Sequence, residues 1–320
     1  PPPAGNGEAG QGHGVHQLVD TRSHLPDGAG LRRGRDADDV GNDTAVRVSG
    51  LRKRYGDTAA VDGIDLEIAC GEVFALLGPN GAGKTTTVEM LEGFRRRDGG
   101  TAEVLGEDPG SAGRLWRARI GIVLQLASVG PELTVRETIA HFAAFYPRPR
   151  DPDEVIELVG LTEKAGARIG TLSGGQARRV DVALGIVGRP ELLFLDEPTT
   201  GFDPQARRQF WELIRELAAG GVTVLLTTHY LEEAEALAGR LAVLAGGRVV
   251  AIGEPSAIGG AGRRTRVSWD TPAGRRSVQT ATPTQAVGDL ARQIGGEIPG
   301  LTVTRPTLED AYLELIGDRR

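Results

Sequence analysis

A glycine-rich stretch that ends in lysine and threonine offers the clearest chemistry in this chain. Residues 78–85 read Gly-Pro-Asn-Gly-Ala-Gly-Lys-Thr and fill every fixed position of the pattern G-x-x-x-x-G-K-[ST]. Glycines allow backbone N–H groups to surround a polyphosphate, and the N-terminus of a following helix adds its positive dipole end. We expect Lys84 to reach the β- and γ-phosphates and Thr85 to hold Mg²⁺.

The surrounding sequence favours a phosphate site over a glycine-rich surface turn with an incidental lysine. Residues 73–77 read as a short buried strand, and residues 86–91 read as a helix. Of the 37 lysines and arginines, only Lys53, Lys84 and Lys164 are lysines. Lysine carries a compact point charge on a flexible side chain, whereas the guanidinium group of arginine is broad and planar. A lysine at position 84 therefore suits a site that contacts phosphates closely.

A phosphate loop needs a second ligand for its metal ion, and an acidic pair at the end of an apolar strand supplies one. Residues 192–195 are Leu-Leu-Phe-Leu, and Asp196 and Glu197 follow them. Asp196 is expected to hold Mg²⁺ directly or through water. Glu197, one position further on, is aimed at the γ-phosphate, where it would act as general base or orient the attacking water.

Two more polar side chains end predicted strands. Gln125 follows the strand at 120–124, and His229 follows the strand at 224–228. Ligands of doubly wound folds bind at the carboxyl ends of such strands. We expect the Gln125 amide to contact Mg²⁺ or the attacking water, and His229 to contact the γ-phosphate.

A second glycine-rich segment opens a helix at residues 172–176, Leu-Ser-Gly-Gly-Gln. Its helix N-terminus is able to bind an anionic phosphate through Ser173, Gly174, Gly175 and Gln176. Ser173 could also simply cap the helix, and a cap and a phosphate contact can coexist.

Composition limits the classes of function. The net charge of −6 over 320 residues argues against a general nucleic-acid binder, which needs clustered positive charge. A single cysteine, Cys70, allows no internal disulfide and suits a reducing compartment. No apolar run is long enough to span a bilayer, so we expect a cytoplasmic protein whose membrane role comes through a partner.

The chain divides into three predicted parts. Residues 1–44 lack apolar periodicity and are expected to form a disordered tail. Residues 45–260 alternate strands and helices, which indicates an α/β core with a largely parallel sheet, interrupted by a helical insertion at about 126–171. Residues 261–320 form a small mixed region. The expected core strands are residues 73–77, 120–124, 192–195, 222–227 and 240–244.

Taken together, these motifs resemble the nucleotide-binding domain of the ATP-binding cassette (ABC) family. Residues 78–85 match the Walker A loop, and residues 192–197 match Walker B with its catalytic glutamate. Residues 172–176 match the LSGGQ signature in every position. Gln125 matches the Q-loop, and His229 matches the switch histidine.

Two further matches extend the resemblance. Residues 200–204 resemble the D-loop around Asp203, with Phe202 where leucine is more usual. Tyr55 matches the aromatic residue that stacks on adenine, although a tyrosine at a strand end often packs in a core instead.

The resemblance implies a P-loop NTPase core with a largely parallel sheet, an antiparallel β subdomain, a helical insertion and a small mixed C-terminal region. It implies ATP and Mg²⁺ as cofactors, with Glu197, His229 and Gln125 in catalysis and Thr85, Gln125 and Asp196 at the metal. The residues expected to bind the nucleotide are Tyr55, Gly78, Pro79, Asn80, Gly81, Ala82, Gly83, Lys84, Thr85, Thr86, Ser173, Gly174, Gly175, Gln176 and Asp203.

The family's architecture implies a head-to-tail homodimer, or a transient dimer formed on membrane subunits, with each ATP between Walker A of one copy and the signature of the other. It also implies a separate membrane-spanning permease on the inner face of the cell membrane, contacted near residues 127–134. A single cassette with this C-terminal extension resembles the exporter branch that includes the daunorubicin-type drug-resistance ATPases, so a drug-like or lipid-like substrate is expected.

Two other functions remain open at this point. One is a soluble ABC ATPase that acts on ribosomes or DNA, although such relatives usually carry two cassettes, a long coiled coil or zinc cysteines. The other is a regulatory module that binds ATP without hydrolysing it, which the presence of Glu197 and His229 disfavours.

Overall fold

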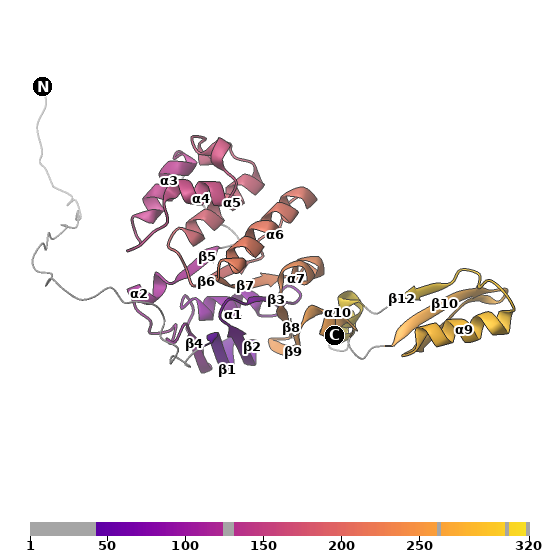
Figure 1. The fold of residues 1–320 in the computed structure, drawn as a ribbon. Helices are drawn as coiled ribbons and strands as arrows, with labels where there is room; N and C mark the ends of the chain where they lie inside the picture. Colours follow the sequence, from indigo (N-terminus) through magenta and orange to yellow (C-terminus); the bar gives the residue numbers. More distant parts are fainter. Residues whose placement is uncertain (1–42, 124–130, 261–263, 305–306, 318–320) are drawn as a thin grey trace, which may run out of the picture. The chain divides into compact units, whose positions relative to one another are not determined.

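The main sheet of the protein has six strands in the order β5-β6-β7-β3-β8-β9 (Figure 1). The computed structural model describes residues 43–123, 131–260, 264–304 and 307–317. Neighbouring strands pair in parallel except β9, which runs antiparallel to β8. The bounds are β3 (Val73–Leu77), β5 (Ile120–Val123), β6 (Leu192–Asp196), β7 (Thr223–Thr228), β8 (Arg240–Ala245) and β9 (Arg248–Gly253). The predicted α/β core with a largely parallel sheet is confirmed.

Successive side chains of the central strands enter two different hydrophobic cores. In β3, Phe74 and Leu76 belong to one core, whereas Ala75 and Leu77 belong to the other. Side chains of a strand alternate between the two faces of a sheet, so a strand covered on both faces must be apolar throughout. This double coverage explains why the core strands appear in the sequence as short unbroken apolar runs.

One face of the sheet is covered by a second, antiparallel sheet and by the helix that follows the phosphate loop. The antiparallel sheet has the order β2-β1-β4. Its strands are β1 (Thr44–Tyr55), β2 (Thr58–Ala69) and β4 (Gly99–Val104), and the helices nearby in sequence are α1 (Lys84–Leu91) and α2 (Arg114–Arg117). Residues of all three strands, α1 and α2 share a core with Phe74 and Leu76.

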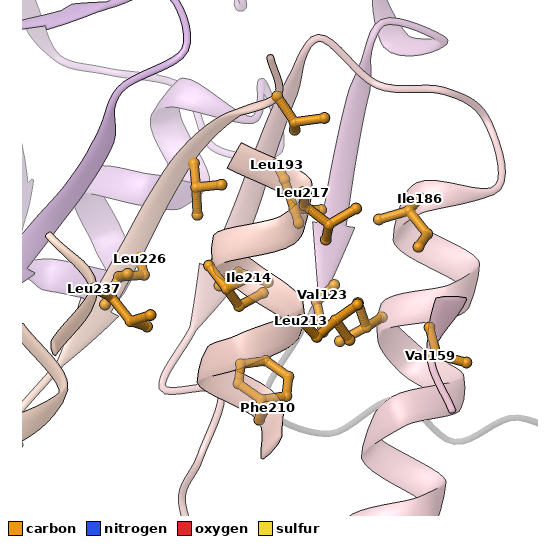
Figure 2. Packing of buried hydrophobic residues seen from close by; sticks show 14 of the residues in the cluster. Val123, Val159, Ile186, Leu193, Phe210, Leu213, Ile214, Leu217, Leu226 and Leu237 are labelled. Atoms are coloured by element: carbon orange, nitrogen blue, oxygen red, sulfur yellow. The ribbon is translucent and has the colours of Figure 1, made fainter. Parts of the chain in front are cut away.

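The other face is covered by the helices α5 (Gly174–Ile186), α6 (Pro204–Ala219) and α7 (Leu231–Leu237). The helices α3 (Val135–Ala143) and α4 (Pro152–Leu158) pack against each other and on α5, and short 3₁₀ turns lie at Thr162–Lys164 and Ile169–Thr171. Figure 2 shows the apolar side of α6, from Phe210 to Leu217, turned toward Leu193 and Leu226 of the sheet. The helices α3 and α4 and both 3₁₀ turns fall within the residues expected to form the helical insertion.

The C-terminal residues form a small separate sheet and two helices that contact the core. The sheet has the order β11-β10-β12, and its bounds are β10 (Thr265–Thr271), β11 (Gly274–Thr280) and β12 (Thr302–Thr304), with α9 at Pro283–Ile294. Helix α10 (Leu308–Gly317) contacts α8 (Pro255–Gly260) and α7. Leu308 and Tyr312 join the helical core. Within the described ranges, no helix combines the length and apolar content needed to cross a membrane.

Candidate active site

The phosphate loop (residues 78–85) joins β3 to α1 and depends on its glycines. Gly81 and Gly83 have φ angles of 79° and 101°, a left-handed conformation that L side chains rarely adopt. A Cβ atom at Gly83 would also lie 2.3 Å from the carbonyl oxygen of Ala60. Glycine at position 83 is therefore required by the fold of this chain itself.

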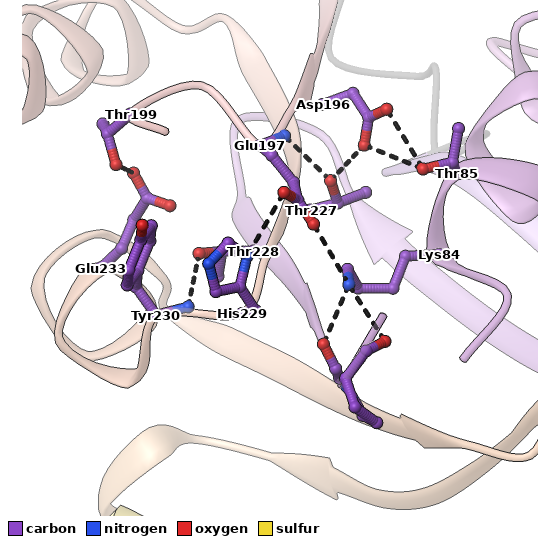
Figure 3. A network of polar contacts seen from close by, with 12 residues as sticks. Lys84, Thr85, Asp196, Glu197, Thr199, Thr227, Thr228, His229, Tyr230 and Glu233 are labelled. Carbon is purple, nitrogen blue, oxygen red and sulfur yellow. Dashed lines mark hydrogen bonds and ion pairs between the residues drawn. The ribbon is translucent and has the colours of Figure 1, made fainter. Parts of the chain in front are cut away.

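Lys84 brings a buried positive charge to the centre of the site. The residue is only 5% exposed. Its Nζ atom donates to the carbonyl oxygens of Gly78 at 2.9 Å and Pro79 at 3.3 Å, and it lies 3.3 Å from Glu197 Oε1 (Figure 3). The ammonium group thus lies between the phosphate loop and the end of β6, where a bound triphosphate would meet it.

Thr85 and Asp196 form a pair of oxygen ligands beside Lys84. Thr85 Oγ1 donates to Asp196 at 3.2 Å from Oδ2 and 3.4 Å from Oδ1. The hydroxyl of Thr227, on the neighbouring strand β7, also donates to Asp196 Oδ1 and fixes the carboxylate (Figure 3). Hydroxyl and carboxylate oxygens are the hard ligands that Mg²⁺ takes, so the residues present fit that ion.

Glu197 is held in a strained conformation next to His229. Its φ angle is 44°, and a non-glycine residue in that region costs about 1–3 kcal/mol unless its surroundings enforce it. Its backbone N–H donates to the Thr227 hydroxyl at 3.0 Å. His229 Nδ1 lies 3.3 Å from Glu197 Oε2, a close approach without the alignment of a hydrogen bond. Strain of this kind clusters at functional sites.

The signature segment (residues 172–176) and Asp203 lie at a different place on the surface. Ser173 caps α5 in a reciprocal capping box with Gln176, and Asp203 caps α6 by accepting from the N–H groups of Gln205 and Ala206. Ser173, Gly174, Gly175, Gln176 and Asp203 all line an open cavity of about 730 Å³, and no residue of the phosphate loop lines it. The structure thus separates the two glycine-rich segments.

Tyr55 ends β1 with an accessible ring. The residue is 44% exposed, which rules out the alternative that it packs in the core. The Arg95 guanidinium lies 5.3 Å from the ring centroid, and Arg95 is paired with Glu89 of α1. The Lys53 ammonium also lies 5.8 Å from the centroid, so two cations accompany an exposed aromatic ring that Arg95 joins to the helix beginning at Lys84.

The structure therefore brings together Lys84, Thr85, Asp196, Glu197 and His229. Pro79, Asn80 and Gly81 are exposed at the top of the phosphate loop, Gly78, Ala82 and Gly83 are buried, and Thr86 continues α1. Gln125, with residues 127–130 of the expected permease contact, lies outside the described residues.

Sequence reasoning missed three polar residues beside this group. They are Thr227, Glu233 and Arg178, and the last two are buried charges on helices. Glu233 Oε1 accepts from the Thr199 hydroxyl at 2.8 Å, and burial raises the pKa of its carboxyl. Thr227 left a weak signal, a hydroxyl at the end of the apolar strand β7, whereas Glu233 and Arg178 lie among other charged residues of their helices, so no local pattern distinguishes them.

Comparison with known proteins agrees with this geometry. The family model described as ABC transporter matches residues 61–200. The chain is 39% identical to the daunorubicin resistance ATP-binding protein DrrA3 of Streptomyces coeruleorubidus over 309 residues, which cover 87% of this chain and 98% of the relative. It is 41% identical to the Nod factor export ATP-binding protein I of Rhizobium sp. (strain N33) over 298 residues, covering 85% and 97%.

A solved structure shows the same fold. The ADP conformation of MJ1267, an ATP-binding cassette of an ABC transporter, matches with a TM-score of 0.59 and 25% identity, covering 66% of this chain and 91% of that one. The chain belongs to the ABC transporter family of ATP-binding proteins, and it is an ATPase.

Proposed function

We propose that this ABC-family ATPase powers an exporter that moves a drug-like or lipid-like substrate through a separate membrane-spanning subunit. The observation that carries the ATPase part is the convergence of Lys84, Glu197 and His229 within 3.3 Å contacts. The exporter part is supported by two relatives, named for daunorubicin resistance and Nod factor export, that match along nearly their whole length.

The phosphate loop and Lys84 would bind the triphosphate. Backbone N–H groups of residues 78–85 and the N-terminus of α1 provide donors, and the Lys84 ammonium neutralises charge on the β- and γ-phosphates. Thr85 and Asp196 would hold Mg²⁺, which supplies further charge neutralisation when bound. Tyr55 would stack on the adenine ring.

Glu197 would act on the attacking water. Its carboxylate contacts Lys84 and His229, which supports a position next to the γ-phosphate of a bound nucleotide. A carboxylate there would accept a proton from the water or orient it, and His229 would hold the γ-phosphate from β7. Gln125 keeps its proposed role beside the metal and the water.

A second copy of the chain would complete each site. Ser173, Gly174 and Gly175 line an open cavity away from the phosphate loop, which supports a contact with the ATP of another copy and not with the chain's own. ATP would then stabilise the closed pair through contacts that hydrolysis removes. Asp203 lines the same cavity and would lie at this dimer interface.

The rest of the chain would serve this cycle at the membrane. We assign residues 45–260 to the ATPase domain, residues 1–44 to a tail and residues 261–320 to an accessory region. The permease would bind near residues 127–134 on the inner face of the cell membrane, and no nucleic acid would take part.

The first test is the substitution Glu197→Gln. The amide keeps the size of the side chain but cannot accept a proton from water, so we expect ATP hydrolysis to fall by about 10²-fold or more. Mg²⁺-dependent ATP binding, measured by calorimetry, and ATP-dependent dimerisation, measured by light scattering, should persist. Turnover equal to that of the parent would contradict the role of Glu197.

The second test concerns the partner. The tagged full-length chain should co-purify from detergent-solubilised membranes with a polytopic membrane protein, and the ATPase rate of the pair should respond to transported compounds. Co-sedimentation with ribosomes or retention on DNA, without any membrane protein, would overturn the exporter proposal in favour of a soluble ABC ATPase.

A further inference from the structure

A buried arginine on α5 contacts the backbone on both sides of the proposed catalytic acid. Arg178 is 7% exposed and lies on the second turn of the helix. Its Nε atom donates to the carbonyl oxygen of Pro198 at 3.2 Å, and its Nη2 atom donates to that of Asp196 at 3.3 Å. These two residues directly flank Glu197, so one guanidinium spans it.

The shape of the arginine side chain suits this contact. Nε and Nη2 lie on one edge of a rigid planar group, so they can reach two carbonyls at a fixed separation. Nη1, on the other side, lies 3.4 Å from Asp181 Oδ2, one helical turn further along α5. The buried positive charge therefore has both a carboxylate partner and hydrogen-bond acceptors, which a buried charge requires.

The loop around Glu197 needs such support. Its left-handed backbone conformation persists only where neighbouring groups enforce it. The Thr227 hydroxyl holds the Glu197 N–H from β7. Arg178 holds the flanking carbonyls from α5, so the loop is fixed by two separate elements of the fold.

We propose that Arg178 is a positioning residue that holds Glu197 in its catalytic placement and ties it to the helix carrying the signature segment. Ser173 caps the same helix five residues before Arg178. A contact that a second copy's ATP makes with Ser173 therefore acts on the same rigid helix that supports Glu197. This proposal rests on the role proposed above for Glu197.

The test is a double-mutant cycle on the full-length chain with MgATP, using Arg178→Gln, Glu197→Gln and the double variant. Because displacement of a reacting group by about 1 Å can cost about 10²-fold, we expect Arg178→Gln to lower kcat by about 10- to 100-fold. The KM for ATP should change by less than about threefold, since the contacts of Arg178 within the described ranges lie at residues 181, 196 and 198 and not in the phosphate loop. Within the Glu197→Gln background, Arg178→Gln should lower the rate by less than about twofold.

Two more variants keep the test informative. Arg178→Lys retains a positive charge beside Asp181 but lacks the rigid edge that spans both carbonyls, so an intermediate kcat is expected. It replaces Arg178→Gln in the cycle should that variant not fold. The matched control is Arg215→Gln, because Arg215 also donates through Nε and Nη2 to a backbone carbonyl, that of Ala236, on the exposed surface. Its kcat should stay within about twofold of the parent.

Single-turnover measurements with labelled ATP give the low rates of the Glu197→Gln background. An equal loss from Arg178→Gln in both backgrounds, or a rise in KM with unchanged kcat, would overturn the positioning role. A Glu197→Gln variant with parental activity would instead overturn the proposed function, so the two failures are distinguishable.

Discussion

The two glycine-rich helix N-termini of this protein use their glycines for different reasons. In the phosphate loop, a Cβ at Gly78 would lie 2.5 Å from the Leu244 carbonyl oxygen, and one at Gly83 would lie 2.3 Å from that of Ala60. In the signature segment, a Cβ at Gly174 would meet no described atom within 4 Å, and its φ is not positive. The first glycines are required by the chain itself, whereas Gly174 has no such requirement.

This difference agrees with different functions for the two segments. The phosphate loop lies among charged groups, Lys84, Asp196 and Glu197, that could bind and cleave a triphosphate. The signature segment offers a neutral capping box and exposed backbone at the edge of an open cavity. A glycine that neither a positive φ nor close packing within the chain requires is expected where a ligand must approach the backbone closely. That ligand, in our proposal, is the ATP of a second copy.

The largest effect should come from Gly174→Asp. The added carboxylate would face the triphosphate held by a second copy, and like charges in such contact cost several kcal/mol, so we expect hydrolysis to fall about 100-fold or more. ATP binding to the isolated chain should be unchanged, because the phosphate loop is untouched. Steady-state phosphate release and calorimetry measure the two quantities.

Gly288→Asp is the control for this variant. Gly288 lies on α9, is exposed and likewise has open space around it. Hydrolysis at the parental rate in Gly174→Asp would mean that the signature segment does not contact nucleotide.

The second comparison concerns stability, with alanine placed at each type of glycine. Gly83→Ala combines a positive φ with a backbone clash, so we expect the free energy of unfolding to fall by about 3 kcal/mol or more. Gly174→Ala should change it by less than about 1 kcal/mol, because alanine fits a helix with open space around it. Urea denaturation of the nucleotide-free chain measures both values. Equal losses would contradict the conclusion that the fold requires glycine at position 83 but not at position 174.

The smallest effect concerns the crowding of acids on the phosphate-loop side. Burial raises the pKa of Glu92, at the end of α1, to about 7, and the negative charges of Asp196 and Glu89 contribute. A carboxyl group that binds its proton more tightly when folded stabilises the protein less as pH rises from about 4.5 through 7. Glu92→Gln should therefore raise the free energy of unfolding by about 2 kcal/mol at pH 8.

At pH 5 the same substitution should have little effect, because the folded protein already carries a neutral Glu92. Urea denaturation without nucleotide at both pH values tests this. A gain of the same size at pH 5 and pH 8 would show that ionisation of Glu92 does not destabilise the folded protein.

The sequence alone determined the parts of the site that are contiguous along the chain. The glycines, Lys84 and Thr85 form one continuous segment, Asp196 and Glu197 form another, and each lies at the end of a strand that an apolar run identifies. Local signals suffice here because strand burial, helix capping and positive φ depend on neighbouring residues.

The tertiary structure decided which of these segments meet. The strand order places β7 between β6 and β3, so His229 and Thr227 arrive beside Glu197 and Asp196, opposite the phosphate loop. It also showed that Tyr55 is exposed and that Arg178 is buried against the Glu197 loop. No local pattern contains this information, because strand order differs from chain order and side chains on different elements meet only when the sheet and its helices have packed.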